Sequence, residues 1–251
     1  MVILSADTTA KTASVCVSKL ENGVLAPLAD ASVHATLTHS ESLLPMIDFC
    51  LRGASLTFSD VDALAMSAGP GSFTGVRIGV ACFKGLAFPH PTLPVVGVST
   101  LEALAYNLAG CSANTVAFPV MDARREQFYN AAFSLARSGA VKRLCPDRVL
   151  DFASLAADLK KSFASKKIVL CGDGAHLFFD LYAKSGENGL ALRLAEERDL
   201  PQNAFSVARA ALPVLTSAAP EKLAETYTAA AFSPVYLRRS QAEREREAKL
   251  S

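Results

Sequence analysis

The sequence predicts an α/β protein, because strand-like and helix-like segments alternate along its 251 residues. Residues 2–7 form a short apolar run, and apolar side chains then alternate with polar ones from Ala13 to Val17, which predicts a β-hairpin. Residues 63–66 enter a glycine-rich turn and a long apolar segment leaves it, which indicates strand, tight turn and helix. The hydrophobic content of 51% is sufficient for one large domain or two small ones.

The charge and cysteine content exclude several classes of protein. A formal net charge of +1 gives no overall electrostatic attraction for nucleic acid, so any RNA contact would be local or shared with a partner. The six cysteines include no Cys-x-x-Cys pair, and most lie in apolar runs, as expected of reduced thiols in a cytoplasmic protein. Neither a signal peptide nor a membrane-spanning run is apparent, so we expect a cytoplasmic protein without membrane contact.

The turn at residues 69–79 is the first candidate for a binding site. Gly69 and Gly71 permit backbone angles that other residues resist, and the turn would present the N–H groups of Ser72, Phe73 and Thr74 at a helix N-terminus. Such a place suits an anion or a carbonyl oxygen. No Lys-Ser/Thr pair follows, so the residues alone favour a plain strand-to-helix turn over a phosphate loop.

The helix predicted over residues 73–88 carries a stripe of small residues, Gly75, Gly79 and Cys82. Each interior glycine costs about 1 kcal/mol relative to alanine, and close packing against another helix would offset that cost. A second, apolar stripe is formed by Val76, Val80, Phe83 and Ala87. This pattern predicts a helix that is buried on both sides or shared with a partner.

Asp7 ends the first predicted strand, where actin-like and sugar-kinase-like folds place a metal-bound phosphate. Those folds usually show Asp-x-Gly-Thr, and the glycine is missing after Asp7 and Thr8. A turn-capping role for Asp7 is therefore at least as favourable as a phosphate site.

A second helix is predicted over residues 38–52, opened by a capping box of Thr38 and Glu41. His39 is the metal-ligand candidate near its start, but Leu43 occupies the position four residues on, where a second ligand would stand. Pro45 is expected to bend the helix or tighten its first turns.

The second half repeats the alternation more loosely. Helices are predicted over 152–163, 175–184, 204–215 and 220–231, with Pro213 ending or kinking the third. Strands are predicted at 94–98, 115–121, 127–133, 167–171 and 190–194. Two charged or glycine-rich turns, 122–126 and 172–174, fit either ligand contacts or ordinary turns.

Six stretches resemble the YeaZ family of bacterial tRNA threonylcarbamoyladenosine biosynthesis proteins, the TsaB proteins. They occur in the family's order: residues 3–9, 38–45, 69–79, 97–104, 119–124 and 234–238. The block at 69–79 is quite specific, whereas 140–219 carries little signal. The resemblance implies an actin/sugar-kinase-like (ASKHA) fold of two lobes, each with a mixed sheet and flanking helices. The expected divisions are 1–98 plus 220–238 for the N-terminal lobe, 99–219 for the C-terminal lobe, and a charged tail at 239–251.

The resemblance also implies a function: a non-catalytic scaffold subunit of the complex that transfers a threonylcarbamoyl group to N6 of the adenosine adjacent to the tRNA anticodon. The partners would be the catalytic paralogue TsaD and the ATPase TsaE, with tRNA contacted only within the complex. TsaD proteins carry a His-x-x-x-His metal pair, whereas His39 is followed by Leu43 here. No cofactor, metal site or catalytic residue is therefore expected in this chain, and ATP/ADP and metal would belong to its partners.

In the family, the helices corresponding to 38–52 and 73–88 form the partner face, which can also join two copies in a homodimer. The interface residues expected on this basis are His39, Leu43, Leu44, Ile47, Leu51, Gly75, Val76, Gly79 and Cys82. The candidate ligand loop consists of Asp7, Thr8, Gly69, Gly71 and Ser72.

Two other functions are compatible with parts of the sequence. The first is an enzyme, either an ATP-dependent phosphotransferase or ATPase, or a glycoprotease-like hydrolase; its four histidines are scattered and show no catalytic constellation. The second is a tRNA-binding module that acts alone, which the net charge of +1 disfavours.

Overall fold

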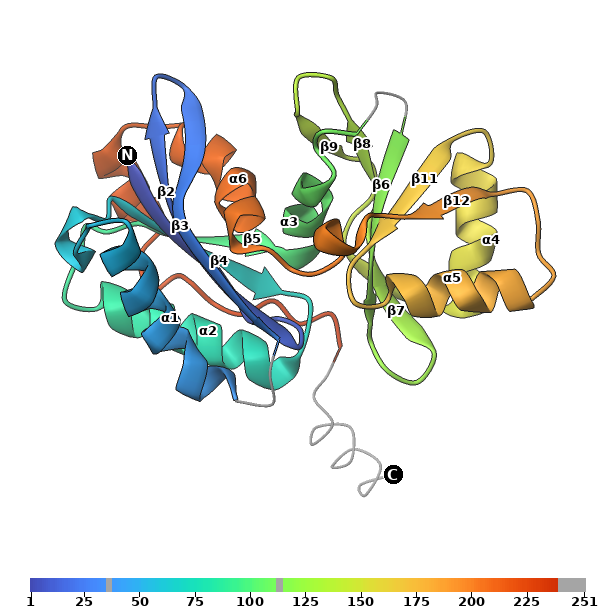
Figure 1. The fold of residues 1–251 in the computed structure, drawn as a ribbon, viewed down its shortest axis with the longest axis horizontal. Helices are drawn as coiled ribbons and strands as arrows, with labels where there is room; N and C mark the ends of the chain where they lie inside the picture. The colour runs from blue at the N-terminus through green and yellow to red at the C-terminus, as the bar shows by residue number, and fades with distance from the viewer. Residues whose placement is uncertain (35–37, 112–114, 239–251) are drawn as a thin grey trace.

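The computed structural model describes residues 1–34, 38–111 and 115–238, and Figure 1 shows two lobes, each built on its own β-sheet. The predicted α/β class and the two lobes, each with a mixed sheet and flanking helices, are confirmed. The charged tail predicted at 239–251 lies outside the described residues.

The first lobe holds a five-stranded sheet in the order β3-β2-β1-β4-β5. Strands β1, β2 and β3 are antiparallel, whereas β1, β4 and β5 are parallel. The strands are β1 (Val2–Asp7), β2 (Thr12–Glu21), β3 (Val24–His34), β4 (Ala63–Gly69) and β5 (Val95–Ser99). One face is covered by α1 (His39–Gly53) and α2 (Phe73–Ala87), and the other by α6 (Ala204–Leu215).

The second lobe repeats this pattern in the order β10-β7-β6-β11-β12. Strands β6, β7 and β10 are antiparallel, and β6, β11 and β12 are parallel. Its path consists of β6 (Thr115–Asp122), β7 (Gln127–Asn130), β10 (Arg148–Asp151), β11 (Lys167–Cys171) and β12 (Ala191–Leu194). Two short strands, β8 (Phe133–Leu135) and β9 (Val141–Arg143), extend it beside β6. Its helices include α4 (Phe152–Phe163) and α5 (Ala175–Lys184).

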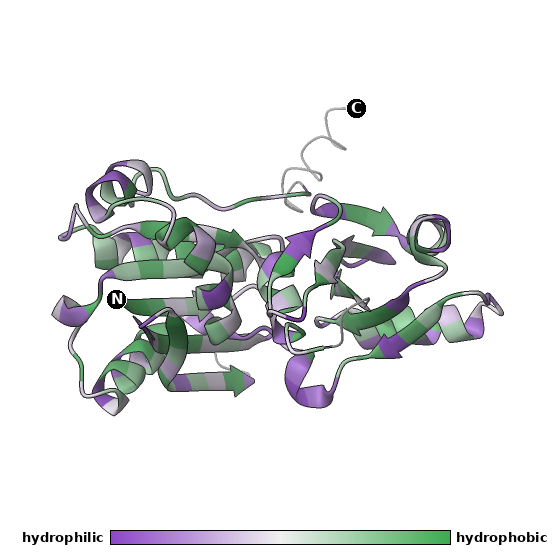
Figure 2. Cartoon of the chain, turned by 90° about the horizontal axis from the view of Figure 1, so that it is seen from above, coloured by the Kyte–Doolittle hydropathy of each residue, from purple (hydrophilic) through white to green (hydrophobic). Residues whose placement is uncertain are grey.

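The remaining helices lie between or beside the lobes. They are α3 (Thr100–Asn107), α7 (Pro220–Thr226), and two 3₁₀ turns, Phe58–Asp60 and Glu197–Asp199. Figure 2 shows hydrophobic segments along the strands of both lobes, as expected for sheets buried by helices. Among the described residues, no helix combines the length and the apolarity that a membrane crossing requires.

One predicted lobe boundary needs correction. We expected residues 99–219 to belong to the second lobe, but α6 packs on the first sheet. The buried face of α6 contacts Ile3, Ala63 and Val96 through small side chains, and the Ser5 hydroxyl donates a hydrogen bond of 2.7 Å to the Ala204 carbonyl. The first lobe therefore includes a helix from late in the chain, and the other predicted limits stay predictions.

Pro213 does not end α6, which continues through it to Leu215 as expected, and the alternative of a kink at Pro213 stays a prediction. Two other local predictions were wrong in detail. The helix predicted over 220–231 ends at Thr226, because the chain turns away there and the Tyr227 carbonyl accepts a 2.7 Å hydrogen bond from Val95 of β5. The return strand predicted over 127–133 is divided into β7 and β8, which pair with different ends of β6.

Candidate partner-binding groove and the adjoining loops

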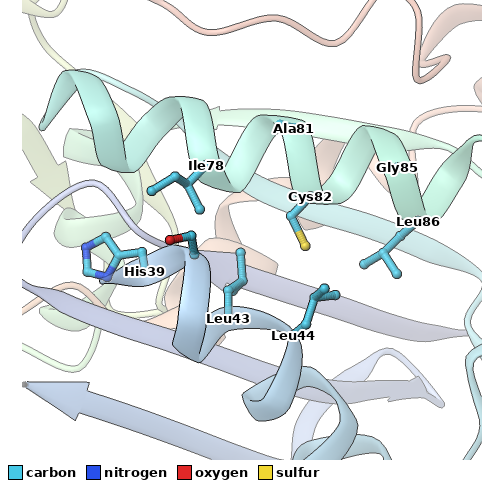
Figure 3. A pocket seen from close by; sticks show the side chains of 9 residues that line it. His39, Leu43, Leu44, Ile78, Ala81, Cys82, Gly85 and Leu86 are labelled. Atoms are coloured by element: carbon cyan, nitrogen blue, oxygen red, sulfur yellow. The ribbon is translucent and has the colours of Figure 1, made fainter. Parts of the chain in front are cut away.

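The outer surface of the first lobe is hollowed between α1 and α2 by a groove of about 440 Å³ (Figure 3). Its side chains are mostly apolar, and Figure 3 shows those of α1 and α2 facing one another across it. The lining consists of His39, Ser40, Leu43, Leu44, Ile78, Ala81, Cys82, Gly85 and Leu86. Leu44 is 54% exposed, and Phe49 and Phe88 on or beside the same two helices are 65% and 85% exposed. An exposed groove with a mostly apolar lining is typical of an interaction site.

Local sequence signals fix where both helices begin. Thr38 and Glu41 form the predicted capping box at the start of α1, with the Thr38 N–H donating to the Glu41 carboxylate over 3.1 Å. Ser72 is the N-cap of α2, and its hydroxyl accepts a hydrogen bond of 3.3 Å from the Gly75 N–H. The two walls of the groove are therefore rigid elements rather than loops.

The two glycines that were predicted to contact a partner point inward instead. A Cβ on Gly75 would lie 2.0 Å from the Thr8 carbonyl oxygen, and one on Gly79 would lie 1.9 Å from Met66 Cε and 2.5 Å from Thr8 Oγ1. The stripe therefore brings α2 close to β1 and β4 of its own lobe. The interface prediction is corrected for Gly75 and Gly79, because sequence spacing shows a small-residue face without showing its direction.

Three of the aliphatic residues expected in the interface also belong to the interior. Ile47, Leu51 and Val76 are 3%, 7% and 1% exposed and pack in the core beneath the two helices, so their prediction is corrected as well. Leu43 is 1% exposed and reaches the groove only at its floor. Of the predicted set, His39, Leu44 and Cys82 stand along the open groove, and their role in an interface stays a prediction.

Sequence reasoning missed most of the α2 wall. Ile78, Ala81, Gly85 and Leu86 line the groove, one position away from the glycine stripe. Their spacing of three, four and one residues is itself helical, and the exposed Gly85, where an added Cβ would meet no atom within 4 Å, marks the open side. Because the two interior glycines on the neighbouring face dominated the pattern, the helical spacing of these groove residues was not recognised.

His39 lies at one end of the groove and is tied to the loop after β1. Its Nε2 is 2.7 Å from the Ala10 carbonyl oxygen, which can only accept, so Nε2 carries the hydrogen and donates. That nitrogen is not available to a metal ion in this arrangement. Within residues 1–34, 38–111 and 115–238, no group of three His, Cys, Asp or Glu side chains is placed to hold a metal.

Asp7 caps the turn that follows β1. Its Oδ1 accepts hydrogen bonds from the Thr9 N–H at 2.8 Å and from the Thr9 hydroxyl at 2.7 Å, so the capping interpretation of Asp7 is confirmed. The side chain is 1% exposed, and burial raises its pKa above the ordinary value of a carboxyl group, despite the hydrogen bonds that lower it.

The candidate ligand loop is brought together as predicted but is filled by the chain itself. The Ser72 N–H donates to the Thr9 carbonyl over 2.7 Å, and a Cβ on Gly71 would lie 2.5 Å from that same oxygen. Gly69, with a φ of 120°, faces the Val235 carbonyl, 2.3 Å from where its Cβ would be. The glycines thus serve close backbone packing, and Thr8 donates its hydroxyl to the Gly75 carbonyl over 2.7 Å.

The two candidate turns of the second lobe are also engaged with protein atoms. Arg124 pairs with Asp122 over 3.3 Å, in agreement with the interpretation of residues 122–126 as an ordinary turn. Gly172, at a φ of 96°, and Gly174 pack against the end of β6, where Cβ atoms would lie 2.4 Å from the Val120 oxygen and 2.7 Å from the Asp122 nitrogen.

All six cysteines are free, as the sequence predicts. Cys16, Cys50 and Cys171 are buried, whereas Cys82, Cys111 and Cys145 are partly exposed. Burial raises the pKa of the Cys82 thiol to about 11, so this groove residue is a weak nucleophile at neutral pH.

Comparison with known proteins now adds a family context to this geometry. A family model described as TsaD, tRNA N6-adenosine threonylcarbamoyltransferase, matches residues 33–246. A Bacillus subtilis protein named tRNA threonylcarbamoyladenosine biosynthesis protein TsaB is 31% identical over 161 residues, which are 64% of this chain and 67% of the relative.

Two further relatives of the same name match over shorter regions. The Haemophilus influenzae protein is 42% identical over 95 residues, and the Escherichia coli protein is 38% identical over 101 residues. These regions are 38% and 40% of this chain, and they span only 40% and 43% of the two relatives.

Two solved structures share the fold over nearly its whole length. A Pseudomonas aeruginosa protein described as similar to the peptidase YeaZ superposes with a TM-score of 0.74, and P. aeruginosa YeaZ with a TM-score of 0.71. Both are 27% identical in sequence, and both matches cover 94% of this chain and 99% of the other.

Proposed function

This chain belongs to the TsaB (YeaZ) family, and from that premise we propose that it is a non-catalytic subunit of the machinery that makes tRNA threonylcarbamoyladenosine. Its role would be to bind a TsaD-like subunit, which transfers the threonylcarbamoyl group to N6 of the adenosine adjacent to the anticodon. The observation that carries the proposal is the exposed apolar groove between α1 and α2.

The residues of this chain support binding rather than catalysis. Leu43 occupies the position of the second histidine expected of TsaD, and its side chain is buried beneath the groove. His39 donates Nε2–H to a backbone carbonyl, and the glycine loop is packed against Thr9 and Val235. In this proposal the nucleotide and the metal are held by partner subunits, and this chain binds no cofactor of its own.

The same groove defines the proposed partners. A TsaD-like protein would cover its apolar lining, and a second copy of this chain would cover it when that protein is absent. A TsaE-like ATPase would join the complex, and tRNA would be bound only by the assembled complex, because the net charge of this chain is +1. The proposed location of the complex is the cytoplasm.

The test is co-expression with the cognate TsaD-like protein, followed by size-exclusion chromatography with light scattering. The wild-type chain is expected to form a 1:1 complex. Leu44→Arg places a charge at the mouth of the groove on a side chain that is already 54% exposed, so the fold should persist. We expect it to weaken the complex by about 30-fold or more, the range of a central interface residue.

The matched control is Leu177→Arg, because Leu177 is 43% exposed on α5 of the other lobe. It should leave the complex unchanged. Failure of the wild-type chain to bind, together with ATP hydrolysis by the chain alone that Asp7→Ala abolishes, would overturn the scaffold proposal in favour of an enzyme. Equal loss of binding in both variants would remove the groove as the interface.

A further inference from the structure

The segment after α7 runs as an irregular strap across the first lobe toward the second (Figure 1). Phe232, 5% exposed, anchors it against Gly97 of β5, where a Cβ would lie 3.0 Å from its ring. The Val235 N–H then donates to the Ala68 carbonyl over 2.7 Å, which extends the pairing along the end of β4. The strap is therefore an ordered part of the first lobe.

Tyr236 next ties the strap to the first turns of α2. Its ring lies 4.8 Å from that of Phe73, centroid to centroid, and its hydroxyl accepts a 3.0 Å hydrogen bond from Arg77 Nε. The Arg77 guanidinium in turn lies 4.0 Å from the centroid of the Phe73 ring. Aromatic and cation–π contacts of this kind fix the orientation of the Tyr236 side chain as well as its position.

Two residues later the strap reaches the other lobe. One guanidinium nitrogen of Arg238, Nη1, donates to the carbonyls of Ala123 and Arg124, the latter over 3.4 Å. These carbonyls belong to the turn between β6 and β7. The contact joins residues that are 115 and 114 positions apart in the chain.

The turn that receives Arg238 has an uncommon backbone. Arg124, Arg125 and Glu126 have φ values of 65°, 55° and 58°, so three consecutive residues with side chains adopt the left-handed region. Such a run persists only where its surroundings determine it. The Asp122 carboxylate accepts the Arg124 N–H over 2.7 Å, and Arg238 donates to the Ala123 carbonyl of the same turn.

We propose that Arg238 is a positioning residue, a clasp that fixes the β6–β7 turn and through it the second lobe against the first. The chain itself crosses between the lobes before β6 and again after β12, on the side of α3 and α6. The Ser99 hydroxyl at the end of β5 also donates to Asp147 of the second lobe, and Arg238 adds a further non-covalent tie from the strap, which is anchored on α2. This proposal does not depend on the proposed function.

The test is hydrogen exchange and small-angle X-ray scattering on the full chain. Arg238→Met keeps most of the side-chain length but removes every donor, whereas Arg238→Lys retains a donor. In Arg238→Met the amides of Ala123, Arg124 and Gln127 should exchange about tenfold faster, as expected when a charged hydrogen bond is lost. The radius of gyration should rise, and Arg238→Lys should recover part of both effects.

The control is Arg52→Met, which removes an exposed arginine that pairs with Asp48 on α1. It should change neither readout. Unchanged exchange in the turn of Arg238→Met would overturn the proposal. Faster exchange there with an unchanged radius of gyration would also overturn it, because Arg238 would then support only the turn. Uniformly faster exchange in both lobes would show general destabilisation, which is likewise contrary to a clasp.

Discussion

The two lobes place a helix pair at equivalent positions, but the two pairs differ in the surfaces that they present. Helices α1 and α2 follow β3 and β4, and α4 and α5 follow β10 and β11, the corresponding strands of the second sheet. Apart from Leu177, which is 43% exposed, the large outward side chains of α4 and α5 are polar or charged: Ser154, Lys161, Ser162, His176, Asp180 and Lys184. On α1 and α2 the corresponding surface includes Leu44, Ile78 and Leu86. The difference shows that the same pair of helix positions can present an apolar or a polar surface, depending on the side chains.

The ends of β1 and β6 show the reverse: the same hydrogen-bonding arrangement occurs in two different environments. Asp7 ends β1 and Asp122 ends β6, and each accepts the N–H of the residue two positions on, over 2.8 and 2.7 Å. Asp7 is almost completely buried, whereas Asp122 is partly exposed and pairs with Arg124. In both lobes a glycine of the turn after the neighbouring parallel strand packs against this strand end.

The largest effect is expected from adding a methyl group to glycines that pack against these strand ends. Gly75→Ala and Gly174→Ala should each lower the free energy of unfolding by about 2–3 kcal/mol, the cost of overpacking. In both cases the new Cβ would meet backbone, the Thr8 oxygen at 2.0 Å and the Asp122 nitrogen at 2.7 Å, which can move less than a side-chain end. Urea denaturation measures the change.

The control for this pair is Gly85→Ala on the open side of α2, where no atom lies within 4 Å of the added Cβ. It should stabilise the protein by up to about 1 kcal/mol through helix propensity. If Gly174→Ala proved harmless while Gly75→Ala did not, the two lobes would not share the same packing device.

The two aspartates give a sharper, pH-dependent comparison. Because burial raises the pKa of Asp7 in the folded chain, the unfolded chain loses this proton at lower pH. Stability contributed by the protonated carboxyl is therefore present at low pH and lost as the pH rises through the folded-state pKa. The stability of Asp7→Asn relative to wild type should consequently increase between pH 4 and pH 8.

Asp122→Asn is the matched variant, since its carboxylate is in contact with water and with the Arg124 guanidinium. The burial that acts on Asp7 is absent at this partly exposed side chain, so Asp122→Asn serves as the comparison. Urea midpoints at the two pH values measure both differences. Equal profiles for the two variants would mean that burial at the end of β1 does not distinguish the lobes.

The sequence predicted the elements well where periodicity is local. Residues 204–215 and 175–184 were expected as helices and form α6 and α5 with the same limits, because their apolar spacing lies within the segment. The sheet that α6 covers was not predictable in this way. A buried stripe of alanines fits either lobe, and its partner on β1 lies about two hundred residues away, as the Ser5 to Ala204 hydrogen bond shows.

The site was predictable in its helices but not in its faces. The capping box at Thr38 and the glycine turn at Gly69 located α1 and α2. The choice between the two faces of α2 depended on Thr8 and Met66, which contact Gly75 and Gly79 only after the sheet has formed. Spacing along the sequence shows which residues share one face of a helix. Tertiary packing decides whether that face points to the core or to solvent.

The smallest predicted effect is chemical and separates a groove thiol from an interior one. Because burial raises the pKa of Cys82 to about 11, its alkylation by iodoacetamide should be slow at pH 8 and accelerate about tenfold per pH unit up to pH 10, following the thiolate fraction. Cys171 of the second lobe, fully buried and also raised in pKa, should stay unmodified in the folded chain. Peptide mass spectrometry measures both, with Cys82→Ser identifying the groove peptide. A rate for Cys82 that levels off below pH 9 would contradict its burial, and an equal rate for Cys171 would show that the second lobe opens as readily as the groove.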